Sequence, residues 1–276
     1  MASIAIEAWA DDCATIEEIE NALADLRLRV GRGGAPDLRT SVLTHMAWVP
    51  QEWQAAATET LAGLGEQHPS RTLLLFPQPE EGDRLAAKVF LECHPLEGEE
   101  RKLCNEVVEL GLGGPRSEAP ASVAMPLLLP DLPVFIRWRG RPAFRTEQFR
   151  QMLAIVNRLI VDSAEWPDVP GAYAELEQFF AIAAVSDIAW RRTLPWREAL
   201  AREWPELPDR IAGPPAETAL LAGWLRSRAG VEVAREPADD IPYAEELDPS
   251  ALLSEELDVF GRDEVYEDAA KIAGLL

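Results

Sequence analysis

The sequence predicts an α/β fold, in which an N-terminal layered sheet with flanking helices is followed by a mainly helical α+β C-terminal domain. Up to about residue 165, short apolar runs typical of strands alternate with amphipathic stretches typical of helices, which favours some parallel strand pairing. After residue 167 the helical patterns dominate. Hydrophobic residues make up 47% and charged residues 27% of the 276, the balance of a globular protein. We therefore expect two domains, 1–165 and 166–276.

The first predicted helix begins at a capping box formed by Thr15 and Glu18 and ends at the glycines of 31–34. A strand rich in β-branched and apolar residues follows over 41–49, and a second helix precedes the turn at His68. Further strands are expected at 71–76, 85–93, 103–110, 134–138 and 159–161. Between them we expect a loop over 111–120 and helices over 122–129 and around 149–156.

The C-terminal part carries helical stripes over 176–184, 220–225 and 265–276, and Pro195 fits the first position of another helix. An acidic loop is expected between residues 237 and 249. The formal net charge is −22, and the stretch 231–276 alone holds 14 acids against 3 bases. This negative balance disfavours binding to a phosphate backbone, so nucleic acid is not an expected partner.

The three cysteines are Cys13, Cys93 and Cys104. The chain starts without the basic segment of a secretion signal, and no apolar run reaches the ~18–20 residues that span a bilayer, so we expect a cytoplasmic protein. Cys93 and Cys104 should face each other across a hairpin whose turn centres between residues 98 and 99. In a cytoplasmic setting two buried, reduced thiols are favoured, and a redox-responsive pair is the alternative.

Few residues could build a catalytic site. The three histidines are His45, expected as a hydrogen-bonded interior residue, and His68 and His94, which both precede proline. The glycine run 111–114 lacks the third glycine of a dinucleotide loop, and no P-loop or nucleophile elbow is present. Cys93, His94 and Cys104 lack the spacing of a structural zinc site. We therefore expect no cofactor, no metal and no enzymatic activity.

The strongest chemical pattern is the segment 130–140. Alternation places Arg137 and Arg139 on one side of a strand and Trp138 on the other, near the carboxyl end where open α/β sheets bind ligands. Asp162 and Ser163 end another short strand in a similar way. The arginines could clamp a carboxylate or phosphate, or they could pair with some of the many acids of the chain.

A second cluster contains tryptophans next to arginines, at 190–192 and 195–197. Such pairs are typical of interface anchors, and they are equally typical of core-edge residues.

Five segments in order carry a family resemblance. They are HPSR at 68–71, PLLLPDLP at 126–133 continuing to RWRG at 137–140, RLIVDS at 158–163, DIAWRRTLPWR at 187–197 and LAGWL at 221–225. Together they resemble the OpcA family of glucose-6-phosphate dehydrogenase assembly proteins. The resemblance implies a non-catalytic cytoplasmic partner, an allosteric activator that stabilises the active dehydrogenase in the oxidative pentose phosphate pathway.

Thirteen residues are candidates for binding the partner or a ligand. They are His68, Ser70, Arg71, Asp131, Arg137, Trp138, Arg139, Asp162, Ser163, Trp190, Arg191, Trp196 and Arg197. The candidate redox pair is Cys93 and Cys104. The competing hypothesis is an α/β enzyme or sensor that binds a phosphorylated sugar through Arg71, Arg137 and Arg139.

Overall fold

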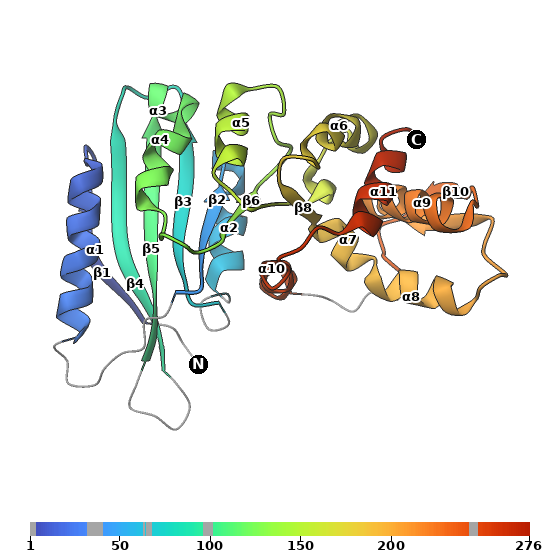
Figure 1. The fold of residues 1–276 in the computed structure, drawn as a ribbon, viewed down its shortest axis with the longest axis horizontal. Coiled ribbons are helices and arrows are strands. Elements are labelled where there is room, and N and C mark those ends of the chain that lie inside the picture. Colours follow the sequence, from blue (N-terminus) through green and yellow to red (C-terminus); the bar gives the residue numbers. More distant parts are fainter. Residues whose placement is uncertain (1–3, 32–40, 63, 65–67, 96–101, 243–247) are drawn as a thin grey trace. The chain divides into compact units, whose positions relative to one another are not determined.

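The computed structural model describes residues 4–31, 41–62, 64, 68–95, 102–242 and 248–276. Contacts within the chain divide it into two compact units, each a body of its own. The first unit is Met1–Arg139 with Arg145–Asn157, and the second is Gly140–Phe144 with Arg158–Leu276. Helices and strands are both abundant, so the predicted α/β class is confirmed (Figure 1). The domain boundary at 165/166 stays a prediction.

The first unit is built on a mixed sheet with the strand order β1-β4-β5-β3-β2-β6. The strands are β1 (Ile4–Asp11), β2 (Leu43–Trp48), β3 (Ser70–Gln78), β4 (Leu85–Pro95), β5 (Lys102–Gly113) and β6 (Val134–Trp138). β1, β4 and β5 pair antiparallel, whereas β5, β3, β2 and β6 pair in parallel. The predicted parallel pairing is therefore present.

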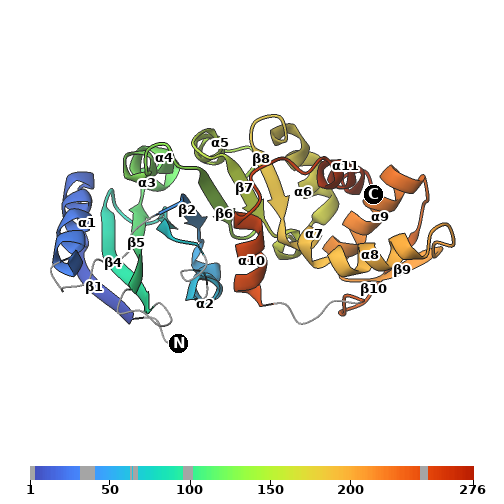
Figure 2. The ribbon, with the colours of Figure 1, turned by 60° about the horizontal axis from the view of Figure 1, so that its bottom comes forward.

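Helices cover both faces of this sheet. Figure 2 shows α3 (Pro115–Glu118), α4 (Pro120–Ala124) and α5 (Glu147–Ala154) on one side of the strands and α2 (Gln54–Ala62) on the other. α1 (Ile16–Gly31) lies on the side of α3 to α5, because its Arg27 pairs with Glu106 on that face of β5. The two faces of the sheet therefore offer separate environments to the side chains that alternate along each strand.

Local sequence patterns explain several of these elements. The predicted capping box forms at the start of α1, where the Glu18 carboxylate accepts the backbone N–H of Thr15 at 2.8 Å and the Thr15 hydroxyl accepts that of Glu18 at 3.3 Å. Ile19, Leu23 and Leu26 are buried on one stripe of the helix, as their spacing predicts.

Two of the secondary-structure predictions for the first unit are wrong. The loop expected over 111–120 is instead the end of β5 followed by α3. Gly113 is the last residue of β5, and a Cβ atom there would collide with the carbonyl oxygen of Gly82, so glycine permits a close backbone approach at this position. The helix expected over 122–129 is the short α4 followed by a 3₁₀ turn, Met125–Leu127. β1 was not predicted at all.

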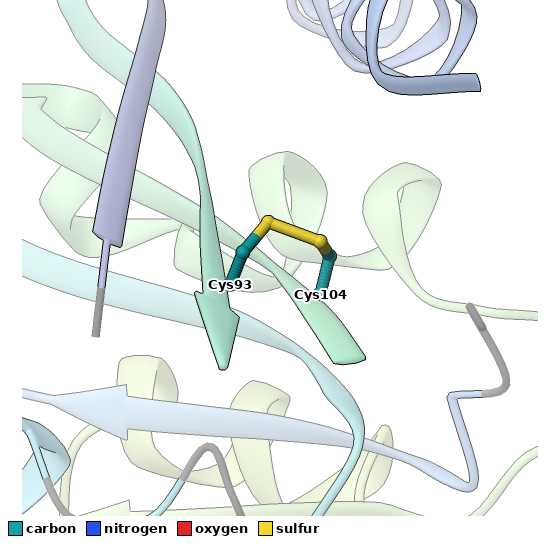
Figure 3. The surroundings of a disulfide bond; sticks show 2 residues. All are labelled: Cys93 and Cys104. Carbon is teal, nitrogen blue, oxygen red and sulfur yellow. A yellow bond between two sulfur atoms is a disulfide. The ribbon is translucent and has the colours of Figure 1, made fainter. Parts of the chain in front are cut away.

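Cys93 and Cys104 are directly paired in β4 and β5, as predicted, with Cα atoms 4.1 Å apart. A disulfide joins them (Figure 3), so the expectation of two reduced thiols is wrong. The strand register brings the two facing side chains close enough for this bond. The predicted turn at residues 98–99 lies outside the described residues. A redox-responsive role for this pair stays a hypothesis.

The second unit contains two parallel strand pairs and a set of helices. The strands are β7 (Arg158–Val161) beside β8 (Ala184–Asp187) and β9 (Arg210–Gly213) beside β10 (Ala234–Pro237). The helices are α6 (Val169–Leu176), α7 (Ile188–Arg192), α8 (Leu194–Arg202), α9 (Pro215–Ala229), α10 (Pro249–Leu257) and α11 (Glu264–Ala273).

The helix predicted over 176–184 is wrong, because the chain is not α-helical over residues 177–184. α6 stops at Leu176, a 3₁₀ turn follows, and Ala184 begins β8, because it pairs with Arg158 of β7 in a ladder that local periodicity does not show. The other two stripes form α9 and α11. The two helices pack closely at Gly223, where a Cβ atom would collide with the backbone of Ala269. Among the described residues, no helix combines the length and apolar character needed to cross a membrane.

Candidate functional site

Arg71 is committed to a buried ion pair in the first unit. Its Nε donates to the Glu106 carboxylate and its Nη1 donates to the carbonyl oxygen of Leu127, both at 2.8 Å. Arg27 of α1 donates to the same carboxylate at 2.8 Å. Burial alone would raise the pKa of Glu106, but the hydrogen bond from Arg27 and the charges of both arginines outweigh burial and lower it. This cluster ties α1 to the sheet.

Arg71 and Arg137 extend from opposite faces of the sheet. Arg71 pairs with Thr44 across the β2–β3 ladder, and Arg137 pairs with Ala47 across the β2–β6 ladder. Positions 44 and 47 of one strand point to opposite sides, because side chains alternate with a period of two. A shared sugar-phosphate site built from Arg71, Arg137 and Arg139, the competing hypothesis from the sequence, is therefore wrong.

Arg137 and Arg139 lie on the face that α2 covers. The Arg139 guanidinium donates to the Thr60 hydroxyl at 2.5 Å and to the Ala56 carbonyl at 3.3 Å. A cation near the C-terminal turn of α2 complements the helix dipole. Arg137 donates to the carbonyl oxygen of Trp138 and is 1% exposed.

Trp138 lies on the other face, as the alternation predicts. It is 2% exposed and stacks on Trp48 with ring centroids 4.9 Å apart, while Phe149 of α5 packs edge-on against it at 5.1 Å. It is a core residue of the first unit and cannot contact a partner.

His45 is an interior residue on the α2 face, as expected. The hydrogen bond that we expected for it is absent among the described residues. Within the described chain neither ring nitrogen has a hydrogen-bond partner. Burial first, and then the positive charges of His68, Arg137 and Arg139, together lower the pKa of His45 to about 3, so the ring is neutral. His68 is itself buried.

The remaining candidates of the first unit occupy separate places. Ser70 is buried at the start of β3, where its backbone N–H donates to the side chain of Asn105 at 3.1 Å. Asp131 is exposed and adopts a left-handed backbone conformation, with φ of 62°. The first unit thus does not gather its predicted site residues into one cluster.

In the second unit, β7 and β8 end at a buried polar network. Asp187 closes β8 and accepts the Tyr173 hydroxyl at 2.6 Å and the backbone N–H groups of Ser163 and Ala189 at 3.0 and 2.9 Å. Burial and the nearby charge of Asp162 raise the pKa of the Asp187 carboxyl to about 6. Ser163 also accepts from the Tyr173 hydroxyl at 2.8 Å.

Asp162 forms an ion pair with Arg192 at the same strand ends. Arg192 donates to its two carboxylate oxygens at 2.9 and 2.6 Å and to the buried Glu217 at 2.8 Å. Burial alone would lower the pKa of Arg192, but the hydrogen bonds and charges of the two acids outweigh burial and raise it. Asp162 therefore joins α7 and, through Arg192, α9 to the strand ends, whereas Ser163 contacts Tyr173 of α6.

Trp190, Arg191 and Arg197 come together at one wall of a cavity. The Arg197 guanidinium carbon lies 3.5 Å from the centroid of the Trp190 ring, whose indole N–H donates to Asp263 at 3.0 Å. Arg191 donates to the buried Glu256 at 2.8 Å. The cavity has a volume of about 210 Å³. It is lined by Arg158, Ser186, Trp190, Arg191, Leu194, Arg197, Glu256, Val259, Asp263 and Tyr266.

Trp196 belongs to a different place. It is 4% exposed and lies in a hydrophobic cluster with Leu200, Ile211, Leu221 and Leu225. Of the six residues of the tryptophan and arginine cluster, Trp196 thus contributes to the core and not to the cavity.

The sequence did not single out several polar residues that line the cavity, among them Arg158, Ser186 and Tyr266. Two of the segments that carry the family resemblance, 158–163 and 187–197, do border the cavity. The presence of both segments in the family resemblance was the one sequence signal that could have pointed to this cavity. Tyr266 comes from α11, far along the chain, and no local pattern connects it to these segments.

The comparisons with known proteins agree with the resemblance. The family model described as glucose-6-phosphate dehydrogenase subunit N-terminal domain matches residues 62–178. The chain is 28% identical over 178 residues to the protein named OxPP cycle protein OpcA of Nostoc punctiforme, which covers 59% of this chain and 38% of that protein. The same-named protein of Synechococcus elongatus is 28% identical over 183 residues, which covers 60% and 41% of the two chains.

The chain has an α/β fold, and residues 62–178 are similar to a domain described as part of a glucose-6-phosphate dehydrogenase subunit. Over this part of its length the chain is similar to the OpcA family. Its matched part spans about two fifths of the length of these curated relatives.

Proposed function

We propose that this chain is a non-catalytic cytoplasmic partner of glucose-6-phosphate dehydrogenase in the oxidative pentose phosphate pathway, where it raises activity by stabilising the active form of the enzyme. The observation that carries the proposal is the match of residues 62–178 to a domain described as part of a dehydrogenase subunit. The relatives named for the OxPP cycle add support.

The mechanism follows from differential binding. A partner shifts the dehydrogenase toward an active state only by binding that state more tightly than the inactive one. About 1.4 kcal/mol of difference gives a tenfold shift, which one well-packed anchor residue can supply.

Trp204 is the side chain best placed to serve as such an anchor. It is 57% exposed, in contrast to the buried Trp138, Trp190 and Trp196. It borders an apolar cavity of about 230 Å³ in the second unit, whose other walls are Leu200, Ala201, Leu207, Trp224, Leu225, Arg228 and Ala229. Interface anchors are enriched in tryptophan, and they act best next to a pocket that excludes water.

The test is a titration of the purified chain into its cognate dehydrogenase, with NADPH formation as the readout and gel filtration to detect a complex. A rise in activity that saturates, together with co-elution, supports the proposal. A flat response and separate elution would overturn it. The chain alone, given glucose 6-phosphate and NADP, should form no NADPH.

Two matched variants test the anchor. Trp204→Ala should weaken the complex by at least about tenfold, whereas Ile182→Ala, which removes a side chain of similar exposure (62%) outside the Trp204 cavity, should leave it unchanged. Both variants should melt near the wild-type temperature, because neither position is buried. Equal binding by the two variants would clear Trp204 and leave the wider proposal standing.

A further inference from the structure

The cavity next to Trp190 has polar walls with unused hydrogen-bonding capacity. Within the described part of the chain, the Arg158 Nε and Nη1 atoms, the Ser186 hydroxyl and the Tyr266 hydroxyl have no hydrogen-bond partner. The three residues are 1%, 6% and 0% exposed. A buried donor that bonds to nothing is costly, so groups of this kind call for an acceptor inside the cavity.

These donors reach the same space from three elements. Arg158 begins β7, and its Nη2 is fixed by donation to the carbonyl oxygen of Gly261, which leaves Nε and Nη1 for another partner. Ser186 lies in β8 on the same face as Arg158, because it pairs with Ile160, two residues further along β7. Tyr266 comes from α11, and its backbone is held by the Asp263 cap at 3.0 Å. The donors are therefore positioned by the fold and not by one another.

The charges around the cavity favour an anion. Its walls hold Arg158, Arg191 and Arg197 against Glu256 and Asp263, a formal excess of one positive charge in a chain whose net charge is −22. Both acids are already engaged, Glu256 by Arg191 and Asp263 by the indole of Trp190. The Arg158 guanidinium thus has no carboxylate bonded to it among the described residues.

The pKa shifts agree with a missing counter-ion. Burial lowers the pKa of Arg158, and it lowers that of Arg197 to about 10, in each case more than the neighbouring acids raise it. Burial raises the pKa of Tyr266 well above its ordinary value, so its hydroxyl remains a neutral donor. A bound anion would stabilise both arginines.

The size of the cavity limits the occupant. A volume of about 210 Å³ is below the ~300–1,000 Å³ of pockets for drug-sized ligands, but it exceeds the ~30 Å³ that one water occupies several times over. Leu194, one of the residues that line the cavity, is 37% exposed. Carboxylate and phosphoryl oxygens accept hydrogen bonds without donating, which matches a wall of guanidinium and hydroxyl donors.

We propose that this cavity binds the carboxylate or phosphoryl group of a small metabolite. Arg158 provides the central cation, and the hydroxyls of Ser186 and Tyr266 donate to the oxyanion from either side. The proposal does not depend on the dehydrogenase, so its test uses the full chain alone and can fail while the proposed partner role succeeds.

The experiment follows binding by calorimetry and by the shift in melting temperature. The probes are inorganic phosphate, malonate and glucose 6-phosphate, each compared with sodium chloride at matched ionic strength. Either oxyanion should give a saturable heat and raise the melting temperature, because a ligand that binds only the folded state stabilises it. Comparing phosphate with malonate shows whether the cavity prefers a phosphoryl group or a carboxylate. If none of the three exceeds chloride, the cavity holds only water and the proposal is overturned.

Variants assign the binding to this cavity. Arg158→Met should lower the affinity at least about tenfold, because it removes the cation but keeps an unbranched apolar stem. The milder variants Ser186→Ala and Tyr266→Phe should each lower the affinity several-fold. They test the proposal if Arg158→Met does not fold. The control is Arg210→Met, at an exposed arginine of β9. Unchanged affinity in all three cavity variants, or an equal loss in the control, would overturn the proposal.

Discussion

The guanidinium carbon of Arg197 lies 3.5 Å from the centroid of the Trp190 ring, so the cation rests on the face of the indole. Neither partner is free to move away. The indole N–H donates to Asp263 at 3.0 Å, and the Arg197 Nε donates to the Thr193 hydroxyl at 3.0 Å. Because the site is largely shielded from water, this cation–π contact should be stronger than one on an open surface.

A double-mutant cycle measures this contact. Trp190→Leu and Arg197→Met, alone and combined, should give a coupling energy of about 1–2 kcal/mol in urea unfolding. The control cycle combines Trp190→Leu with Arg202→Met, an exposed arginine bound only to Glu198 among the contacts described for it, and its coupling should be close to zero. A coupling near zero in both cycles would show that the stacked geometry adds nothing beyond burial.

The Glu106 carboxylate is the counter-ion of the buried Arg71. Glu106→Gln leaves that arginine buried without a charge partner, so we expect a loss of about 3–5 kcal/mol in the free energy of unfolding. The control Glu81→Gln breaks an exposed pair with Arg84 and should cost less than about 1 kcal/mol. Similar losses at the two positions would contradict the structural role of the buried pair.

The same pair gives a pH dependence of known sign. The folded-state pKa of Glu106 is lowered, so its contribution to stability is present above the unfolded-state value of 4.5 and is lost as the pH falls below it. The stability gap between wild type and Glu106→Gln should therefore narrow in acid. A gap that stays constant from neutral pH to the acid range would argue that the carboxylate is not ionised in the fold.

The disulfide predicts a thiol count. Denatured, unreduced protein should react with an alkylating reagent at Cys13 alone, and all three cysteines should react after reduction. Reduction should lower the melting temperature, since closing a short loop stabilises by about 2–3 kcal/mol. The double variant Cys93→Ser, Cys104→Ser should melt independently of reductant. Three reactive thiols before reduction would show that the pair is reduced and that the sequence-based expectation was right.

Elements with a strong local pattern were predictable. The capping box of Thr15 and Glu18 places the start of α1, and Pro133 with the alternation after it gives β6 at residues 134–138. The facing of Cys93 and Cys104 followed from the hairpin register alone. In each case residues close in the sequence determine the geometry.

What could not be predicted depends on pairing between distant residues. β1 pairs at the edge of the sheet beside β4, and Ala184 enters β8 because β7 lies next to it. Likewise, whether Arg71 and Arg137 lie on the same side of the sheet depends on the register in which β3 and β6 pair with β2. No local sequence pattern shows this register. For the cavity, the sequence pointed to Trp190, Arg191 and Arg197 but not to the distant Tyr266.

Asp187 predicts a second pH effect, opposite in sign to that of Glu106. Its folded-state pKa of about 6 lies above the ordinary 3.8, so between these values the folded protein holds a proton that the unfolded chain has released. The stability that this proton provides is present at low pH and is lost as the pH rises through about 6. Above that pH the fold carries the cost of a buried carboxylate.

Asp187→Asn removes the ionisable group while its side-chain carbonyl can still accept the N–H groups of Ser163 and Ala189. The stability of wild type relative to Asp187→Asn should fall by up to about 3 kcal/mol from pH 4 to pH 7, as a shift of about two pKa units implies. Urea unfolding across this range measures the difference. The control Asp131→Asn changes an exposed carboxyl. The stability of wild type relative to this control should vary by less than about 0.5 kcal/mol over the same pH range. A wild-type advantage that grows with pH would show that the Tyr173 hydroxyl and the backbone donors outweigh burial and keep Asp187 ionised.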